Sequence, residues 1–133
     1  MQPVIDFSGK LSVSNTAYDA VSRYSYTPPA GKYLLVREVS VAGDSTFLSN
    51  GKIQMVISGN SVTSNAGTAT EISPLNSFSL PFGDDDLIIL GPGEKLEVNM
   101  RVTSGTGTAQ ALLIGMLLNE VEYRALLAKK GLV

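Results

Sequence analysis

The sequence contains one cluster of residues that is suited to holding a metal ion, the run Asp84-Asp85-Asp86. Carboxylate oxygens are the ligands that a hard cation such as Ca²⁺ prefers, so Asp84, Asp85 and Asp86 form a candidate calcium site. Three consecutive aspartates cannot all point at one ion, however, and the spacing of an EF-hand loop is absent. The alternative interpretation is a solvent-exposed loop between two strands.

Tyrosines form a second candidate site. Tyr18, Tyr24 and Tyr26 are spaced by even numbers within residues 18–27, which we predict to be a strand, so all three would lie on one face. An aromatic face of this kind can stack on a sugar ring, but tyrosine is equally typical of protein cores and subunit contacts. The chain has no tryptophan, which sugar-binding platforms usually contain. Tyr24 and Tyr26 are therefore also candidates for a subunit interface.

The residues that most often perform catalysis are missing. The chain has no histidine and no cysteine, which excludes histidine bases and ligands, thiolate metal sites and disulfides. The stretch Gly91-Pro92-Gly93-Glu94-Lys95 is rich in glycine and carries a lysine, but it lacks the spacing of a phosphate-binding loop. No serine has the spacing of a known nucleophile motif. We therefore expect a non-enzymatic protein with no cofactor and no bound metal.

Length and charge set further limits. A chain of 133 residues corresponds to one domain, and its net charge of −2 is spread along the sequence without a basic run for nucleic acid. The first six residues do not resemble a secretory signal, so we expect synthesis in a cytoplasm. The longest apolar run, Ala111 to Leu118, is interrupted by Gly115 and is far shorter than the ~20 residues of a membrane-spanning helix. Membrane insertion is not expected.

The pattern of turns and strands predicts an all-β fold. Thirteen glycines and six prolines separate short stretches in which apolar and polar residues alternate, as in an antiparallel β-sandwich. Residues 1–9 are either an edge strand or an N-terminal arm. One short C-terminal helix is predicted over residues 120–130, because Asn119 and Glu122 have the spacing of a capping box.

The stretch from Gly91 to Asn119 is predicted to be a long β-hairpin. Its first strand alternates regularly, with Leu96, Val98, Met100 and Val102 on one face. Its return strand, Ala111 to Leu118, is apolar on both faces, so something must cover the second face. A second sheet layer, the terminal helix or a neighbouring subunit could cover this face. The candidate interface residues on this strand are Leu112, Leu113, Ile114 and Met116.

Two segments carry a resemblance to known proteins. TPPAGKYLLVREVSVAG (27–43) and LGPGEKLEVNMRVTSGTGTAQALLIGMLL (90–118) together resemble small jelly-roll virion proteins, of the phage minor-capsid and capsid-decoration type. Cupins share these turns but bind their metal through histidines, which this chain lacks.

The resemblance implies a single jelly-roll domain over residues 1–133 and a structural role in a virus particle. It also implies a virion location, contacts with other capsid proteins, and a homo-oligomer, which we expect to be a trimer. The alternative is a β-sandwich module that binds a carbohydrate or a receptor.

Overall fold

The computed structural model describes residues 1–58, 67–68, 78–81 and 88–131. Strands dominate the described residues, and the prediction of an all-β protein with one short C-terminal helix is confirmed. The strands are β1 (Gln2–Phe7), β2 (Leu11–Val13), β3 (Arg23–Tyr26), β4 (Tyr33–Gly43), β5 (Gly51–Ser58), β6 (Gly67–Thr68), β7 (Phe78–Pro81), β8 (Ile89–Leu90), β9 (Lys95–Val102) and β10 (Gly107–Leu118). The helices are the 3-10 helix η1 (Ala20–Ser22) and the α-helices α1 (Ser45–Asn50) and α2 (Glu120–Lys129).

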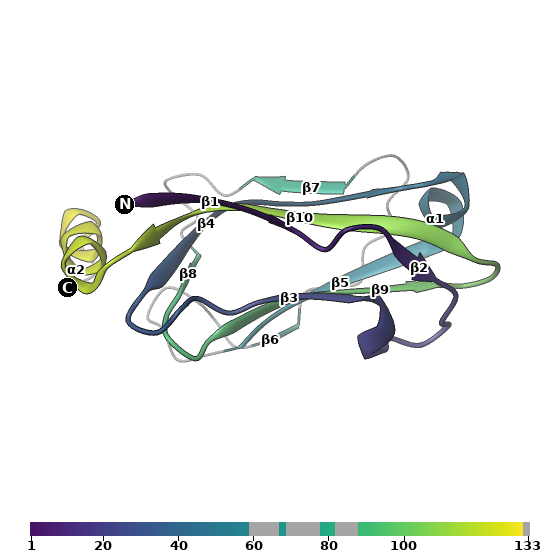
Figure 1. Cartoon of the computed structure of the whole chain (residues 1–133), viewed down its shortest axis with the longest axis horizontal. Coiled ribbons are helices and arrows are strands. Elements are labelled where there is room, and N and C mark those ends of the chain that lie inside the picture. Colours follow the sequence, from purple (N-terminus) through teal and green to yellow (C-terminus); the bar gives the residue numbers. More distant parts are fainter. Residues whose placement is uncertain (59–66, 69–77, 82–87, 132–133) are drawn as a thin grey trace.

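The strands form two antiparallel sheets that stack as a sandwich (Figure 1). Sheet A has the order β1-β10-β4-β7, with β2 also pairing with β10 and β8 also pairing with β4. Sheet B has the order β3-β9-β5-β6. Residues 1–9, for which the sequence left two possibilities, include the edge strand β1.

The strand pairs are nested within one another along the chain. β1 and β2 pair with β10, β3 pairs with β9, β4 pairs with β7 and β8, and β5 pairs with β6. Successive pairs alternate between sheet A and sheet B. The arrangement is that of a long two-stranded ribbon that has been rolled up, and it places the first and last strands side by side.

The prediction of a hairpin between β9 and β10 is wrong. β9 lies in sheet B between β3 and β5, whereas β10 lies in sheet A between β1 and β4. The turn that joins them therefore crosses from one layer to the other. Alternating apolar residues show which face of a strand is buried, but they do not distinguish a partner in the same sheet from one across the core.

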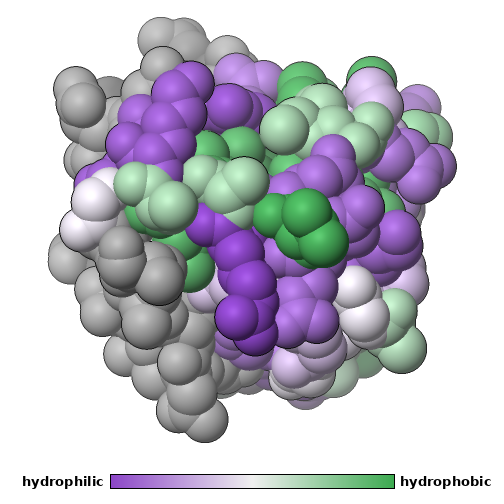
Figure 2. Space-filling view, turned by 90° about the vertical axis from the view of Figure 1, so that its left-hand side faces the viewer, coloured by the Kyte–Doolittle hydropathy of each residue, from purple (hydrophilic) through white to green (hydrophobic). Residues whose placement is uncertain are grey.

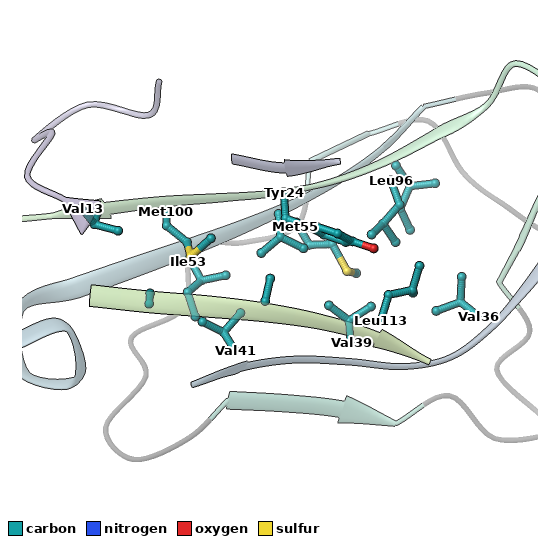
Figure 3. Close-up of a cluster of buried hydrophobic side chains, with 14 of the residues drawn as sticks. Val13, Tyr24, Val36, Val39, Val41, Ile53, Met55, Leu96, Met100 and Leu113 are labelled. Carbon is teal, nitrogen blue, oxygen red and sulfur yellow. The ribbon is translucent and has the colours of Figure 1, made fainter. Parts of the chain in front are cut away.

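The core fills the space between the sheets. The predicted inward face of β9 is fully buried, and it meets the odd-numbered residues of β10 and the inner face of β4. Figure 3 shows Val39, Val41 and Leu113 of sheet A opposite Ile53, Met55, Leu96 and Met100 of sheet B.

Helix α1 closes one end of this core and was not predicted. The Asp44 carboxylate accepts a hydrogen bond from the Phe47 amide (2.9 Å) and caps the start of this helix. The Phe47 side chain is fully buried. A Cβ atom on Gly43, Gly51 or Gly107 would lie 2.7, 2.3 or 2.9 Å from atoms of Phe47, so these positions require glycine.

Helix α2 docks at the opposite end of sheet A. The Asn119 side chain accepts from the Glu122 amide (2.8 Å) while the Glu122 carboxylate accepts from the Asn119 amide (3.0 Å), which is the predicted capping box. The ring of Tyr123 stacks on Tyr33 with 3.9 Å between centroids. Leu127 is buried in a small second cluster with Leu35, Ile89 and Leu118.

The predicted strand over residues 18–27 is shorter than expected. Ala20–Ser22 form η1, because the Asp19 side chain accepts from the Val21 amide (3.3 Å) and the chain turns before β3 begins at Arg23. Tyr18 therefore does not share a face with Tyr24. Its ring lies 5.5 Å from the guanidinium carbon of Arg101, in cation–π contact.

Candidate self-association surface

The outer face of sheet A carries exposed apolar side chains. The even-numbered residues Leu112, Ile114 and Met116 of β10 point away from the core between the sheets and are partly exposed, and Met116 also packs against the second cluster beside α2. Their partners across the β1–β10 ladder are Phe7, Ile5 and Pro3. Directly opposed residues of an antiparallel pair share a face. These six residues, Pro3, Ile5, Phe7, Leu112, Ile114 and Met116, are called the apolar strip below.

Most of the highly exposed large hydrophobic residues lie on or near β1. In the described part of the chain they are Met1, Ile5, Phe7, Val21 and Val121, of which Ile5 is 69% and Phe7 59% exposed. The Met1 ammonium contacts Glu122, so the start of β1 lies beside the start of α2. Met1, Ile5, Phe7 and Val121 therefore belong to one region of the surface, and Val21 lies elsewhere, in η1. Figure 2 shows the end of the molecule that carries α2, where hydrophobic patches lie among hydrophilic side chains. Exposed apolar residues that lie near one another mark contact surfaces more often than singly scattered ones do.

The outer face of sheet B is polar by contrast. The Arg23 Nε donates to Asn99 Oδ1 (2.6 Å) and pairs with Glu97 (3.1 Å), and the Lys95 ammonium lies 3.7 Å from the same carboxylate. A charged face of this kind suits contact with water. The two outer faces of the sandwich therefore differ, and the apolar strip is a feature of sheet A.

A hydrogen bond ties the strand that carries the strip to the other sheet. The Tyr24 hydroxyl of β3 donates to Asp6 Oδ2 of β1 (2.7 Å), which joins sheet B to sheet A along the edge of the sandwich. Burial raises the pKa of the Tyr24 hydroxyl far above its usual value, and the hydrogen bond to Asp6 raises it further. Burial and the Asp6 charge also raise the pKa of Tyr26.

No protein-family model, no curated protein and no solved structure matches this chain. Among the residues that the structure describes, no helix is long and apolar enough to cross a membrane. Fold and surface are therefore the observations from which a function can be inferred.

The predicted interface residues fall into two groups. Leu112, Ile114 and Met116 lie on the apolar strip, and Tyr26 is partly exposed. Tyr24 and Leu113 are buried in the core of the chain itself, 4% and 0% exposed, and offer no surface to a neighbour.

The calcium candidates Asp84, Asp85 and Asp86 lie outside the described residues. Within residues 1–58, 67–68, 78–81 and 88–131, no three His, Cys, Asp or Glu side chains come together to hold a metal ion.

A shallow depression lies at the other end of the outer face of sheet A. Its described lining residues are Lys10, Ala42, Gly43, Asp44, Thr108, Ala109 and Gln110. None of these is aromatic, and the Asp44 carboxylate already caps α1. The depression therefore does not supply the stacking platform that a sugar site would use.

Sequence reasoning missed Ile5 and Phe7. Both share the parity of Pro3, whereas Val4 and Asp6 have the opposite parity and point inward. This alternation was visible in the sequence and indicated a strand with two apolar outward residues. The sequence did not show which strand lies beside this one, and that neighbour decides whether the outer face is covered.

The hydrogen bond between Tyr24 and Asp6 leads to a pH prediction. Because the native pKa of Tyr24 is raised above the value near 10 of an unfolded tyrosine, its contribution to stability is complete below pH 10 and is lost as the pH rises further. We expect Tyr24→Phe to lower the free energy of unfolding at pH 7 by about 1.5–3 kcal/mol, since the acceptor is charged. Above pH 10 the variant should lose stability less steeply than the wild type. Urea unfolding between pH 8 and 11 measures both effects. If the free energies of unfolding of the two proteins fall in parallel as the pH rises, the prediction is contradicted.

Proposed function

We propose that this chain is a non-enzymatic structural protein of a virus particle, a capsid or capsid-decoration component that assembles with further copies of itself. The apolar strip on sheet A is the observation that carries the proposal. Apolar surface removed from water stabilises a contact by about 25 cal/mol per Å² before the costs of association, and the strip supplies such surface.

The nested strand pairs support the jelly-roll assignment. A jelly roll places eight strands in two sheets and is common in viral capsid and lectin domains and in cupins. Here the eight strands are β1, β10, β4 and β7 in sheet A and β3, β9, β5 and β6 in sheet B. The two remaining strands, β2 and β8, are short additions to sheet A. A jelly roll with an exposed apolar strip fits a particle subunit.

The expected partners follow from this role. Copies of the chain would associate with one another, as a trimer on the resemblance to virion proteins, and would contact other capsid proteins in the virion. Subunits of symmetric particles present surface patches that repeat identically in every copy. The apolar strip is such a patch.

The carbohydrate-binding alternative is not favoured by the described residues. Tyr24 is buried and its hydroxyl is bound to Asp6, while Tyr18 lies against Arg101. The three tyrosines therefore do not form the stacking face on which that alternative depends.

Self-association is tested by exchanging one exposed apolar residue. We expect the wild type to be oligomeric by light scattering at micromolar concentration and Ile5→Lys to shift it toward the monomer, because a charge replaces apolar contact on the strip. Val21→Lys is the matched control, since Val21 is also 69% exposed but belongs to η1. A monomeric wild type, or equal effects of the two substitutions, would contradict self-association through the strip.

The assignment to a virion needs its own measurement. We expect mass spectrometry of purified particles from the source culture to detect this chain in many copies per particle. Recovery of the chain from cell extract alone, with none in the particles, would contradict the assignment.

A further inference from the structure

We propose that β1 pairs antiparallel with β1 of a second copy, so that sheet A continues across a two-fold axis into the neighbouring subunit. This inference rests on the proposed self-assembly and adds to it a two-fold contact between two copies. A two-fold contact is isologous, so it differs from the heterologous contact that would close a trimer.

The first observation is the free edge of β1. β1 stands at the end of sheet A and, within the described part of the chain, pairs with β10 alone. The Ser8 amide donates to the carbonyl of Ala111 (3.0 Å). Hydrogen-bonded residues alternate in an antiparallel ladder, so the even residues of β1 face β10 and the backbone groups of Ile5 and Phe7 point away from it. These outward groups are the ones that an added strand would use.

The second observation is that the side chains of this edge do not repel another strand. Natural edge strands are often blunted by outward lysines, by proline or by inward-pointing charges; β1 has the last two in Pro3 and Asp6, but its outward side chains carry no charge. The sole charged residue of β1 is Asp6, and its carboxylate is turned toward Tyr24. The edge strand of sheet B, β3, instead carries Arg23 in an ion pair with Glu97.

The third observation concerns the ends of the free edge. Pro3 has no N–H to donate, and Gly9 has a φ of 72° that breaks the extended backbone after Phe7. Pairing is thereby limited to residues 3–7, and an antiparallel match of this segment with itself is centred on Ile5. Ile5 then exchanges hydrogen bonds with Ile5 of the second copy, and each Phe7 amide meets a Pro3 carbonyl.

The side chains of a second copy fit this register. Opposed residues share a face, so the apolar strips of the two copies join into one surface.

Cross-linking tests the register directly. The chain has no cysteine, so Ile5→Cys introduces a single thiol. Hydrogen-bonded antiparallel residues have Cα atoms about 5.5 Å apart, which a disulfide can bridge. We expect mild oxidation to give a covalent dimer on a non-reducing gel. Val21→Cys, which places a thiol at an equally exposed site, should remain largely monomeric on that gel. No excess of dimer for Ile5→Cys would overturn the proposal.

A pair of substitutions separates edge pairing from simple contact between faces. Ile5→Ala and Ile5→Pro both remove the apolar side chain, but only Ile5→Pro also removes the outward N–H. We expect light scattering to show association at least tenfold weaker for Ile5→Pro than for Ile5→Ala, with both melting cooperatively.

The outcomes distinguish this inference from the proposed function. Equal weakening by the two substitutions would show that the copies meet face to face, which overturns β1 pairing and leaves self-assembly intact. A wild type that stays monomeric would overturn both. If Ile5→Pro fails to fold, the cross-linking result decides.

Discussion

Leu113→Asp is expected to unfold the chain, whereas Leu112→Asp, one residue earlier on the same strand, leaves it folded. The Leu113 side chain is 0% exposed and lies between the two sheets among apolar neighbours (Figure 3). An unpaired carboxylate in such a place costs several kcal/mol, which is comparable to the whole stability of a typical domain, about 5–15 kcal/mol. Leu112 points to the outer face of sheet A and is partly exposed, so its replacement keeps a carboxylate in contact with water.

Circular dichroism and light scattering together measure this pair. The Leu113 variant should lose its cooperative melting transition, and the Leu112 variant should keep it while associating more weakly, because the charge falls on the apolar strip. If both variants unfold, the outer face of β10 is covered within the chain itself, and the proposed self-association surface is wrong.

Phe47→Ala is expected to lower the free energy of unfolding by about 3–5 kcal/mol, the usual range for removing a buried phenylalanine ring. The cost should be near the upper end because the surroundings cannot close around the cavity. Three glycines approach Phe47, and their backbones belong to β4, β5 and β10. Backbone in three strands cannot collapse inward without breaking ladder hydrogen bonds.

Leu48→Ala is the matched control for this prediction. Leu48 is the next residue of α1 and is only partly buried, so its replacement should cost clearly less than that of Phe47. Urea denaturation of the two variants gives the comparison. Equal losses, or a loss below about 1 kcal/mol for Phe47→Ala, would show that α1 is not part of the cooperative core.

The fold class could be predicted from the sequence because side-chain parity is a local property. Val98 and Met100 alternate with polar residues and are fully buried as predicted, and the capping box at Asn119 marks the start of α2. The placement of β9 and β10 in different sheets could not be predicted, since a strand that faces another across a core has the same pattern of side chains as a strand beside it. Helix α1 was missed because a six-residue helix with one buried anchor, Phe47, shows no periodicity.

The candidate site was predicted in part, again from the parity of side chains along a strand. A strand that is apolar on both faces indicated that one face of β10 needs cover, and Leu112, Ile114 and Met116 do lie on the outer face. Parity could not show which face was inward, so Leu113 was grouped with them although it is core. Ile5 became part of the site only through its partner Ile114, far away in the sequence.

The nested strand order also sets when the molecule can form during synthesis. β1 pairs with residues 112–117, so its partner is made long after β1 itself. β10 also separates β1 from β4, and sheet A therefore cannot be completed until the chain has been translated through Leu118. Folds dominated by such distant pairings typically form in milliseconds to seconds, after the slow loop closure has occurred. Because β1 is ordered on β10, a nascent chain cannot join another copy through this edge before β10 has been made, and assembly begins only with chains in which β10 is in place.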